Sequence, residues 1–208
     1  MYLISLYFDE KTENRISGYM KQIAKYTGNT AMLDGNVPPH ITIAAFHAES
    51  EEQAKHIFRN ASSRAVSGKV QWVTVGSFLP NVIYIAPVLN EYLYRLSEIY
   101  NKEISLYKEI ESDKRYQPLG WFPHTTLAKR LAADQLCKGF EIMQKQFGPF
   151  EGQAVKVGLS KTNPYKDIEV TVHGYINWLR QNAEIEKSFL GISNCGLSRH
   201  VNVSPDHF

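Results

Sequence analysis

Hydrophobic positions along this chain follow two spacings that alternate with one another. Short runs of apolar and β-branched residues predict strands, and apolar residues spaced three and four apart predict amphipathic helices. In the first half, strands are expected at residues 2–8, 38–46 and 69–78, and helices at 12–27 and 50–65. The predicted order of this half is therefore βαβαβ.

The second half repeats that order with one additional strand. The same spacings predict strands at residues 82–88, 122–130, 154–162 and 167–175, and helices at 89–110 and 133–147. We interpret residues 111–123 as a solvated loop that leads into the second of these strands. Because the two halves share one element order, the sequence predicts an internally duplicated α+β protein with antiparallel or mixed sheets.

Residues 177–208 lie beyond the two predicted halves. Apolar residues at helical spacing, Trp178, Leu179, Ile185 and Phe189 among them, predict a helix followed by a loop rich in Gly, Ser and Asn. We expect this C-terminal extension to pack either against the sheet or against a second copy of the chain, which would make the protein a dimer.

Composition narrows the class of protein without identifying a partner. The chain has 208 residues, of which 43% are hydrophobic and 21% charged, as in an ordinary globular protein of one domain. Its net charge of +2 neither requires nor excludes a nucleic-acid partner. Any preference for phosphate must therefore come from local groups of residues.

The first residues and the cysteines favour a cytoplasmic location. The apolar run at residues 2–8 has no basic flank and no small-residue cleavage site, so we interpret it as a strand and expect neither a signal peptide nor a membrane partner. Cys137 and Cys195 are far apart and lack the spacing of a metal site, which favours reduced thiols.

Two of the predicted strands carry the same motif. "PPHITIAAF" occupies residues 38–46, "FPHTTLAKR" occupies residues 122–130, and the second histidine lies 84 positions after the first. Alternate side chains of a strand share a face. This alternation groups His40, Thr42, Ala44 and Phe46 on one face of the first strand, and His124, Thr126, Ala128 and Arg130 on one face of the second.

Paired histidines and threonines suit chemistry at a phosphodiester. A histidine, with a pKa of about 6.5, gives or takes a proton at neutral pH, and in-line displacement needs a base and an acid on opposite sides of phosphorus. Thr42, Thr126 and Arg130 would supply hydrogen-bond donors to the nonbridging oxygens. We expect no cofactor and no metal site, because neither motif carries a neighbouring Asp, Glu or Cys at ligand spacing and alternation points His47 to the other face.

"HIT" at residues 40–42 and "HTT" at residues 124–126 resemble the paired motifs of the 2H phosphoesterase superfamily, which includes 2′-5′ RNA ligase-like proteins and cyclic nucleotide phosphodiesterases. The segment "VGSFLPNVIYIAPV" at residues 75–88 is similar to the stretch that often lies between those motifs. The resemblance covers about residues 1–175.

This resemblance implies a fold, an activity and a set of catalytic residues. The expected fold is one bilobal domain over residues 1–176, with pseudo-twofold symmetry, a central cleft, and lobes at about residues 1–78 and 79–176 that are able to exchange strands. The implied activity is metal-independent hydrolysis or ligation of 2′,3′-cyclic or 2′-5′ phosphodiesters in RNA ends or nucleotides. The catalytic pattern carries over onto His40, Thr42, His124 and Thr126.

Several side chains have two interpretations. Arg130 either binds phosphate or is a solvated charge at the end of a strand, and Phe46 either stacks on a nucleobase or packs in the core. The same choice applies to Phe78, Trp121 and Phe122, of which the last two would wall the cleft before the second motif.

Three functions remain open on the sequence alone. The first is a phosphodiesterase, the second a non-catalytic protein that binds RNA or nucleotides in the same cleft, and the third a 2′-5′ RNA ligase. Because acid and base serve both directions of a reaction, the residues do not separate hydrolysis from ligation. The near symmetry of the motifs also leaves open which of His40 and His124 is the acid.

Overall fold

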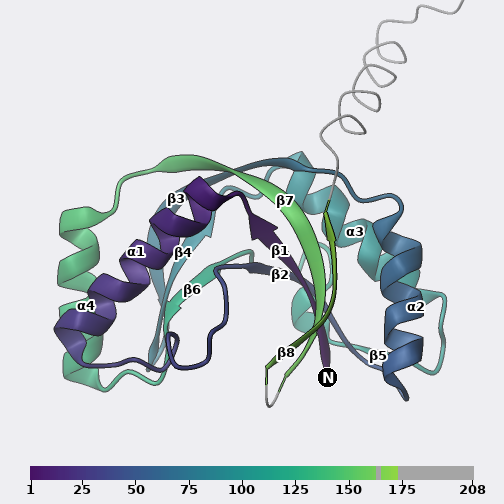
Figure 1. Cartoon of the computed structure of the whole chain (residues 1–208), viewed down its shortest axis with the longest axis horizontal. Helices are drawn as coiled ribbons and strands as arrows, with labels where there is room; N and C mark the ends of the chain where they lie inside the picture. Colours follow the sequence, from purple (N-terminus) through teal and green to yellow (C-terminus); the bar gives the residue numbers. More distant parts are fainter. Residues whose placement is uncertain (163–164, 173–208) are drawn as a thin grey trace, which may run out of the picture.

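An antiparallel sheet at the centre of the molecule bends into an arch (Figure 1). The computed structural model describes residues 1–162 and 165–172. Within them the strands are β1 Tyr2–Phe8, β2 Ile41–His47, β3 Gly68–Phe78, β4 Val82–Pro87, β5 Glu111–Ser112, β6 Thr125–Ala128, β7 Phe150–Lys161 and β8 Lys166–Val172. Their order is β5-β2-β1-β7-β3-β4-β6, and β8 pairs with β7. The predicted α+β class and antiparallel sheet are confirmed.

Two groups of three strands within this sheet have the same pairing. In one group β1 lies between β2 and β7, and in the other β4 lies between β6 and β3. β3 belongs to the first half of the sequence and β7 to the second, so each half contributes one strand to the other half's group. β7 also joins the groups, because residues 150–154 pair with β3 and residues 154–161 pair with β1. The pairing thus crosses the predicted lobe boundary at residue 78.

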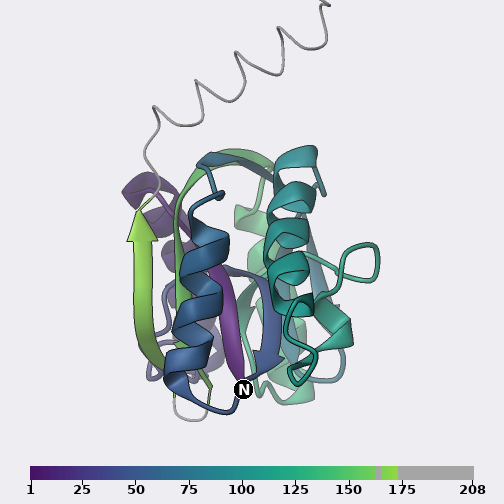
Figure 2. The same ribbon diagram turned by 90° about the vertical axis from the view of Figure 1, so that its right-hand side faces the viewer.

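Four helices cover the two ends of the arch. They are α1 Glu10–Thr27, α2 Glu51–Ser62, α3 Glu91–Ser105 and α4 Ala133–Gln146, and a 3-10 turn, η1, spans Lys114–Tyr116. α1 packs against α4 and β6, whereas α3 packs against α2 and β2 (Figures 1 and 2). The first helix of each half therefore lies on the strand that carries the other half's motif.

Side-chain caps determine where three of the helices begin. Asp9, Ser50 and Asn90 each accept a hydrogen bond from the backbone N–H three residues later, which satisfies a donor that the first helical turn leaves free. α1 ends at Gly28, whose φ of 72° lies in the left-handed region that glycine adopts without steric cost.

The prediction of one long helix over residues 89–110 is wrong at both ends. Asn90 caps α3, so Leu89 precedes the helix and is 45% exposed. At the other end, the N–H groups of Leu106 and Tyr107 donate to carbonyls three residues back, which tightens and ends the last turn. Ile110 still packs against the core, from outside the helix.

The expected solvated loop at residues 111–123 is wrong in its first part. Glu111 and Ser112 pair with the end of β2 as the edge strand β5, and Asp113 N–H donates to the Ala45 carbonyl. Asp113 also forms an ion pair with Arg115 at 2.6 Å. These bonds hold the segment against β2 before it reaches the second motif.

Some expectations fall on residues outside the described ranges. The C-terminal extension at residues 177–208, its proposed dimer contact and Cys195 are among them. Cys137 is a free, exposed thiol on α4. In the part of the chain that the structure describes, no helix has the length and apolar character needed to cross a bilayer.

Candidate active site

His40 and His124 occupy matching backbone positions. Each immediately precedes its strand, β2 or β6, and each is half-buried. Nδ1 of His40 lies 2.8 Å from the carbonyl oxygen of Pro38, and Nδ1 of His124 lies 2.9 Å from that of Phe122. Because a carbonyl only accepts, Nδ1 carries the proton in both rings. Nε2 is therefore the atom that takes up or releases a proton.

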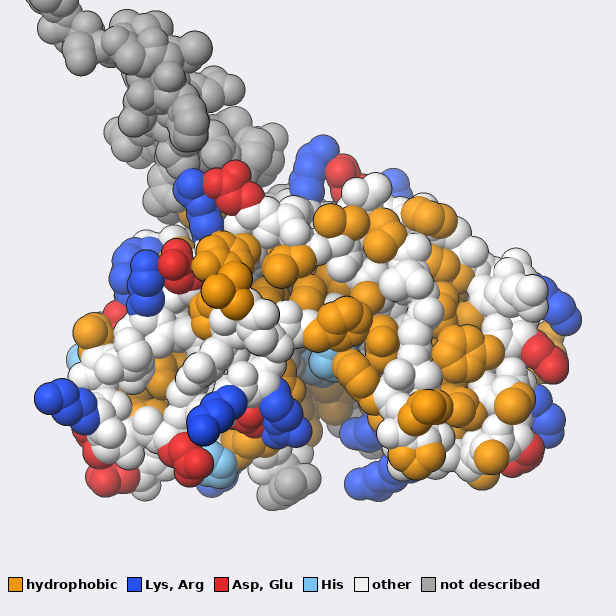
Figure 3. Space-filling model, turned by 180° about the vertical axis from the view of Figure 1, so that it is seen from behind, with side chains coloured by type: hydrophobic (Ala, Val, Ile, Leu, Met, Phe, Trp, Pro, Cys, Tyr) orange, Lys and Arg blue, Asp and Glu red, His pale blue; other side chains and the backbone are white. Residues whose placement is uncertain are grey.

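The two imidazole rings are close enough for their charges to interact. Burial lowers the pKa of His40, and the positive charge of His124 lowers it further. Burial also lowers the pKa of His124. Figure 3 shows a histidine side chain near a hollow in the middle of one face, among hydrophobic side chains. The structure thus brings His40 and His124 within range of one another's charge.

The two threonines share a register but have different neighbours. Thr42 lies opposite Ser5 of β1, with their hydroxyl oxygens 3.4 Å apart, and is 9% exposed. Thr126 lies opposite Tyr84 of β4 and is half-buried. Ser5, beside the threonine of the first motif, thus corresponds to the aromatic Tyr84 beside the threonine of the second motif.

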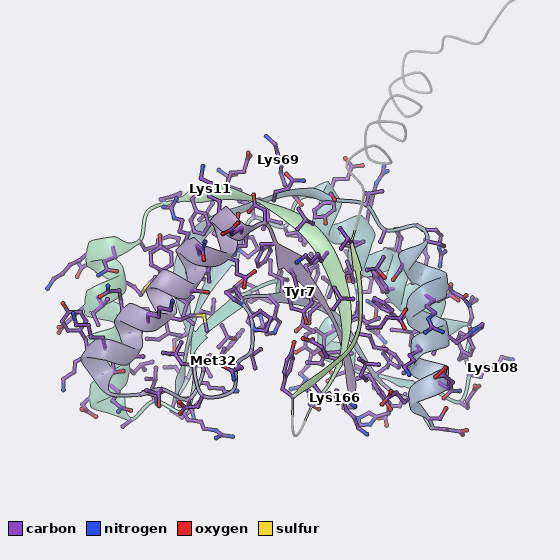
Figure 4. The ribbon with its side chains drawn as sticks, viewed as in Figure 1. Tyr7, Lys11, Met32, Lys69, Lys108 and Lys166 are labelled. Atoms are coloured by element: carbon purple, nitrogen blue, oxygen red, sulfur yellow. The ribbon has the colours of Figure 1, made fainter. Side chains whose placement is uncertain are left out.

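Tyr7 lies beside His40 and is fixed from two sides. Its ring centroid is 6.3 Å from that of His40, and the ring occupies the space above Gly158, where a Cβ would lie 2.5 Å from it. Figure 4 shows Tyr7 on the concave side of the arch. Its hydroxyl lies 2.9 Å from that of Tyr165 and 3.2 Å from Oδ1 of Asp167.

Asp167 brings a negative charge to the same end of the site. It accepts a hydrogen bond of 2.6 Å from the Tyr165 hydroxyl, and its charge raises the pKa of His40 against the larger lowering caused by burial. Sequence reasoning missed Tyr7, Tyr165 and Asp167. They carry no motif, and only the pairing of β1 with β7, together with the turn between β7 and β8, brings them together.

Aromatic rings surround His124 instead. Phe78 meets it edge-on at 4.7 Å between centroids, Tyr84 lies at 5.6 Å and Phe122 at 6.3 Å. Phe78 is 40% exposed and Phe122 48% exposed, so both present ring surface to solvent at the site. The structure therefore places two of the predicted substrate contacts, Phe78 and Phe122, next to His124.

Two other predicted contacts are part of the core. Phe46 has no exposed surface and stacks on Tyr2 at 5.9 Å, so in this structure it is not available to a substrate. Trp121 is 6% exposed, and its indole N–H donates to the carbonyl of Thr42 at 2.9 Å. This bond ties the segment before the second motif to the strand of the first, so Trp121 supports the site from below its surface.

Two basic residues end the second motif. Arg130 is exposed, and it lines a cavity together with Lys129, whose positive charge contributes to lowering the pKa of His40. Within residues 1–162 and 165–172, no three His, Cys, Asp or Glu side chains are grouped as metal ligands would be. The described site brings together imidazole, hydroxyl and cationic groups with the carboxylate of Asp167.

No protein family model matches the sequence, and no curated protein sequence matches it. Among solved structures, Escherichia coli LigT with 3′-AMP is similar with a TM-score of 0.57 at 13% identity, over 83% of this chain and 97% of that one. A structure described only as a phosphoesterase has a TM-score of 0.56 at 15% identity, over 83% of this chain and 97% of that one.

A third structure, TT0787 of Thermus thermophilus, has a TM-score of 0.55 at 17% identity, over 82% of this chain and 96% of that one. Escherichia coli LigT has also been solved with phosphate, ATP and NADP+. At these identities the likeness concerns the fold. The predicted α+β fold with an antiparallel sheet is therefore shared with these solved structures.

Proposed function

We propose that this protein is a 2H-type phosphodiesterase that cleaves 2′,3′-cyclic or 2′-5′ phosphodiester bonds in RNA ends or nucleotides without a metal. The observation that carries the proposal is the matched pair His40 and His124, each with Nδ1 held by the carbonyl two residues earlier. The fold shared with Escherichia coli LigT supports it, and that protein has been solved with 3′-AMP and with phosphate.

The two histidines divide the proton transfers of one hydrolysis. One ring, neutral at Nε2, accepts the proton of a water that attacks phosphorus. The other ring, protonated at Nε2, donates its proton to the ribose oxygen as the bond from phosphorus to that oxygen breaks. The depressed pKa values of both rings keep a neutral base available near neutral pH. Either histidine fills either role in this scheme.

Five of the remaining predicted residues bind the substrate. Thr42 and Thr126 donate hydroxyl hydrogens to the nonbridging oxygens of the phosphate, which gain charge in the transition state. Phe78 and Phe122 stack on a nucleobase, as exposed aromatic rings do in proteins that bind single-stranded RNA. Arg130 contributes a guanidinium for phosphate.

The test is an assay of 2′,3′-cyclic nucleotides and 2′-5′ dinucleotides in the presence of EDTA. Turnover by the wild-type protein is expected, and His40→Gln or His124→Gln should lower kcat/KM by about 10²- to 10⁴-fold. His47→Gln is the matched control, because His47 lies on the same strand but is exposed next to β5.

Other outcomes would point to the other candidate functions. Binding of nucleotides without turnover would indicate a non-catalytic binding protein, and joining of RNA ends would indicate a ligase. Full activity in the double variant His40→Gln/His124→Gln would refute the proposal, because no acid–base pair would then remain.

A further inference from the structure

A cavity of about 730 Å³ opens beside the candidate active site. Asn29 and Asp34 of the turn after α1 line one wall, Lys129 and Arg130 after β6 line another, and Gln135 and Tyr165 complete it. The volume falls in the range of pockets that hold small molecules. Its lining is polar and charged, which differs from the aromatic surroundings of His124.

Two contacts place this cavity next to His40. The positive charge of Lys129 acts on the His40 ring and contributes to lowering its pKa. Tyr165, on another wall, has its hydroxyl 2.9 Å from that of Tyr7, whose ring faces His40 at 6.3 Å. Two residues that line the cavity, Lys129 and Tyr165, are therefore linked to the His40 end of the candidate active site.

The cavity carries an excess of uncompensated positive charge. Across residues 1–162 and 165–172, neither the Lys129 nor the Arg130 side chain has an ion-pair or hydrogen-bond partner. Asp34 is the opposing charge in the lining, and its Oδ2 accepts a hydrogen bond of 2.7 Å from Thr30. Two free cations against one carboxylate favour an anionic ligand.

The backbone at Arg130 is held in an unfavourable conformation. Its φ of 58° is left-handed, which is uncommon for a residue with a side chain. Asn29 Nδ2 donates to the Arg130 carbonyl at 3.1 Å, and the Leu131 N–H donates to the Asn81 carbonyl at 3.1 Å. The first of these bonds joins two residues that both line the cavity. Backbone strain of this kind gathers at ligand-binding sites.

We propose that this cavity is a subsite for a second phosphate group of the substrate. Lys129 would act as a point charge and Arg130 as a planar donor fork for that phosphate. The substrate class is then an RNA end or an oligonucleotide in preference to a mononucleotide that carries the scissile phosphate alone. This inference rests on the proposed function for the position of the first phosphate.

The experiment compares the binding of 3′-AMP and adenosine 3′,5′-bisphosphate, which differ by one phosphate. Calorimetry at low salt should give a Kd about tenfold lower for the bisphosphate with the wild-type protein. Lys129→Gln and Arg130→Asn should each bring the ratio of the two Kd values toward one. Asparagine is chosen at residue 130 because it tolerates the left-handed backbone and lacks the guanidinium.

The matched control is Lys108→Gln, an exposed lysine at the far end of the arch from Tyr7 (Figure 4), which should leave the ratio unchanged. Three outcomes would overturn the inference. They are equal Kd values in the wild-type protein, a ratio of Kd values that is unchanged in both cavity variants, and failure of either nucleotide to bind. Failure of the proposed function is detected by a different experiment, as the absence of turnover of cyclic phosphates. The ratio of the two Kd values remains measurable in that case.

Discussion

The two ends of the candidate site share a backbone arrangement and differ in almost every side chain around it. His40 lies with Tyr7 and with the charges of Asp167 and Lys129, whereas His124 lies among the rings of Phe78, Tyr84 and Phe122. What is common to both ends is the part that proton transfer requires. What differs is the part that would orient a substrate. The aromatic rings around His124 would hold a nucleobase, and the charged groups around His40 would interact with charged parts of the substrate.

The largest effect should come from the part that the two ends share. His40→Gln and His124→Gln are expected to lower kcat/KM by similar factors, about 10²- to 10⁴-fold, and the double variant should fall little further because the two rings act as one unit. Steady-state kinetics in EDTA measures this. A loss confined to one histidine would break the equivalence of the two ends.

Substitutions of Gly158 and Gly76 test how rigidly Tyr7 and Tyr84 are packed. A Cβ at Gly158 would lie 2.5 Å from Cε2 of Tyr7, whose hydroxyl is bonded to Tyr165 and Asp167. Gly158→Ala should therefore lower the free energy of unfolding by about 1–3 kcal/mol through overpacking, as measured by urea denaturation.

Gly76→Ala is the corresponding change at the other end. Its Cβ would lie 2.5 Å from Cζ of Tyr84, the far end of a half-buried side chain that is able to move outward. We expect a loss of less than about 1 kcal/mol. An equal or larger loss than for Gly158→Ala would show that the His40 end is not the more rigid one.

Removing the exposed ring beside His124 should weaken nucleobase binding. Phe78→Ala is expected to raise KM about tenfold for cyclic nucleotides, because stacking on one ring contributes about 1–3 kcal/mol per base. Leu79→Ala is the matched control, since Leu79 is adjacent and 79% exposed. Equal changes in KM for both variants would argue against a stacking role.

The smallest expected effect is a change in the pKa of one histidine and not of the other. Because the charge of Asp167 raises the pKa of His40 and does not act on His124, Asp167→Asn should lower the pKa of His40 and leave that of His124 unchanged. NMR titration of the two imidazole rings measures both. A shift shared by both histidines would contradict the placement of Asp167 at one end.

Sequence periodicity predicted the parts of this structure that depend on local pattern. The order of the main strands and helices follows from apolar spacing, and the repeated motif associates His40 and His124 with two matching strands. Both histidines were predicted inside those strands, at 38–46 and 122–130, whereas the structure places each immediately before its strand. Alternation along a strand tells which side chains share a face, but not which faces other elements cover. Tyr2 stacks on Phe46, which has no exposed surface, so Phe46 is closed to a substrate although it was predicted to share a face with His40 and Thr42.

Contacts between distant segments were beyond the reach of periodicity. Tyr7 and Asp167 lie 160 positions apart and meet only through the exchange of β7 into the first strand group. The left-handed backbone of Arg130 likewise depends on bonds from Asn29 and to Asn81, in two other segments. Of the residues that make the two ends different, Tyr7, Tyr165 and Asp167 are therefore the ones that the sequence left unmarked.

The most direct test of acid–base catalysis by the two histidines is the pH dependence of kcat/KM for a 2′,3′-cyclic nucleotide in EDTA. This profile reports the pKa values of the free protein, and burial lowers both below the usual value of about 6.5. We therefore predict a bell-shaped profile with its maximum on the acid side of about pH 6.5, one limb of which disappears in each single histidine variant. A profile that is flat, or that keeps both limbs in His40→Gln and in His124→Gln, would contradict the account.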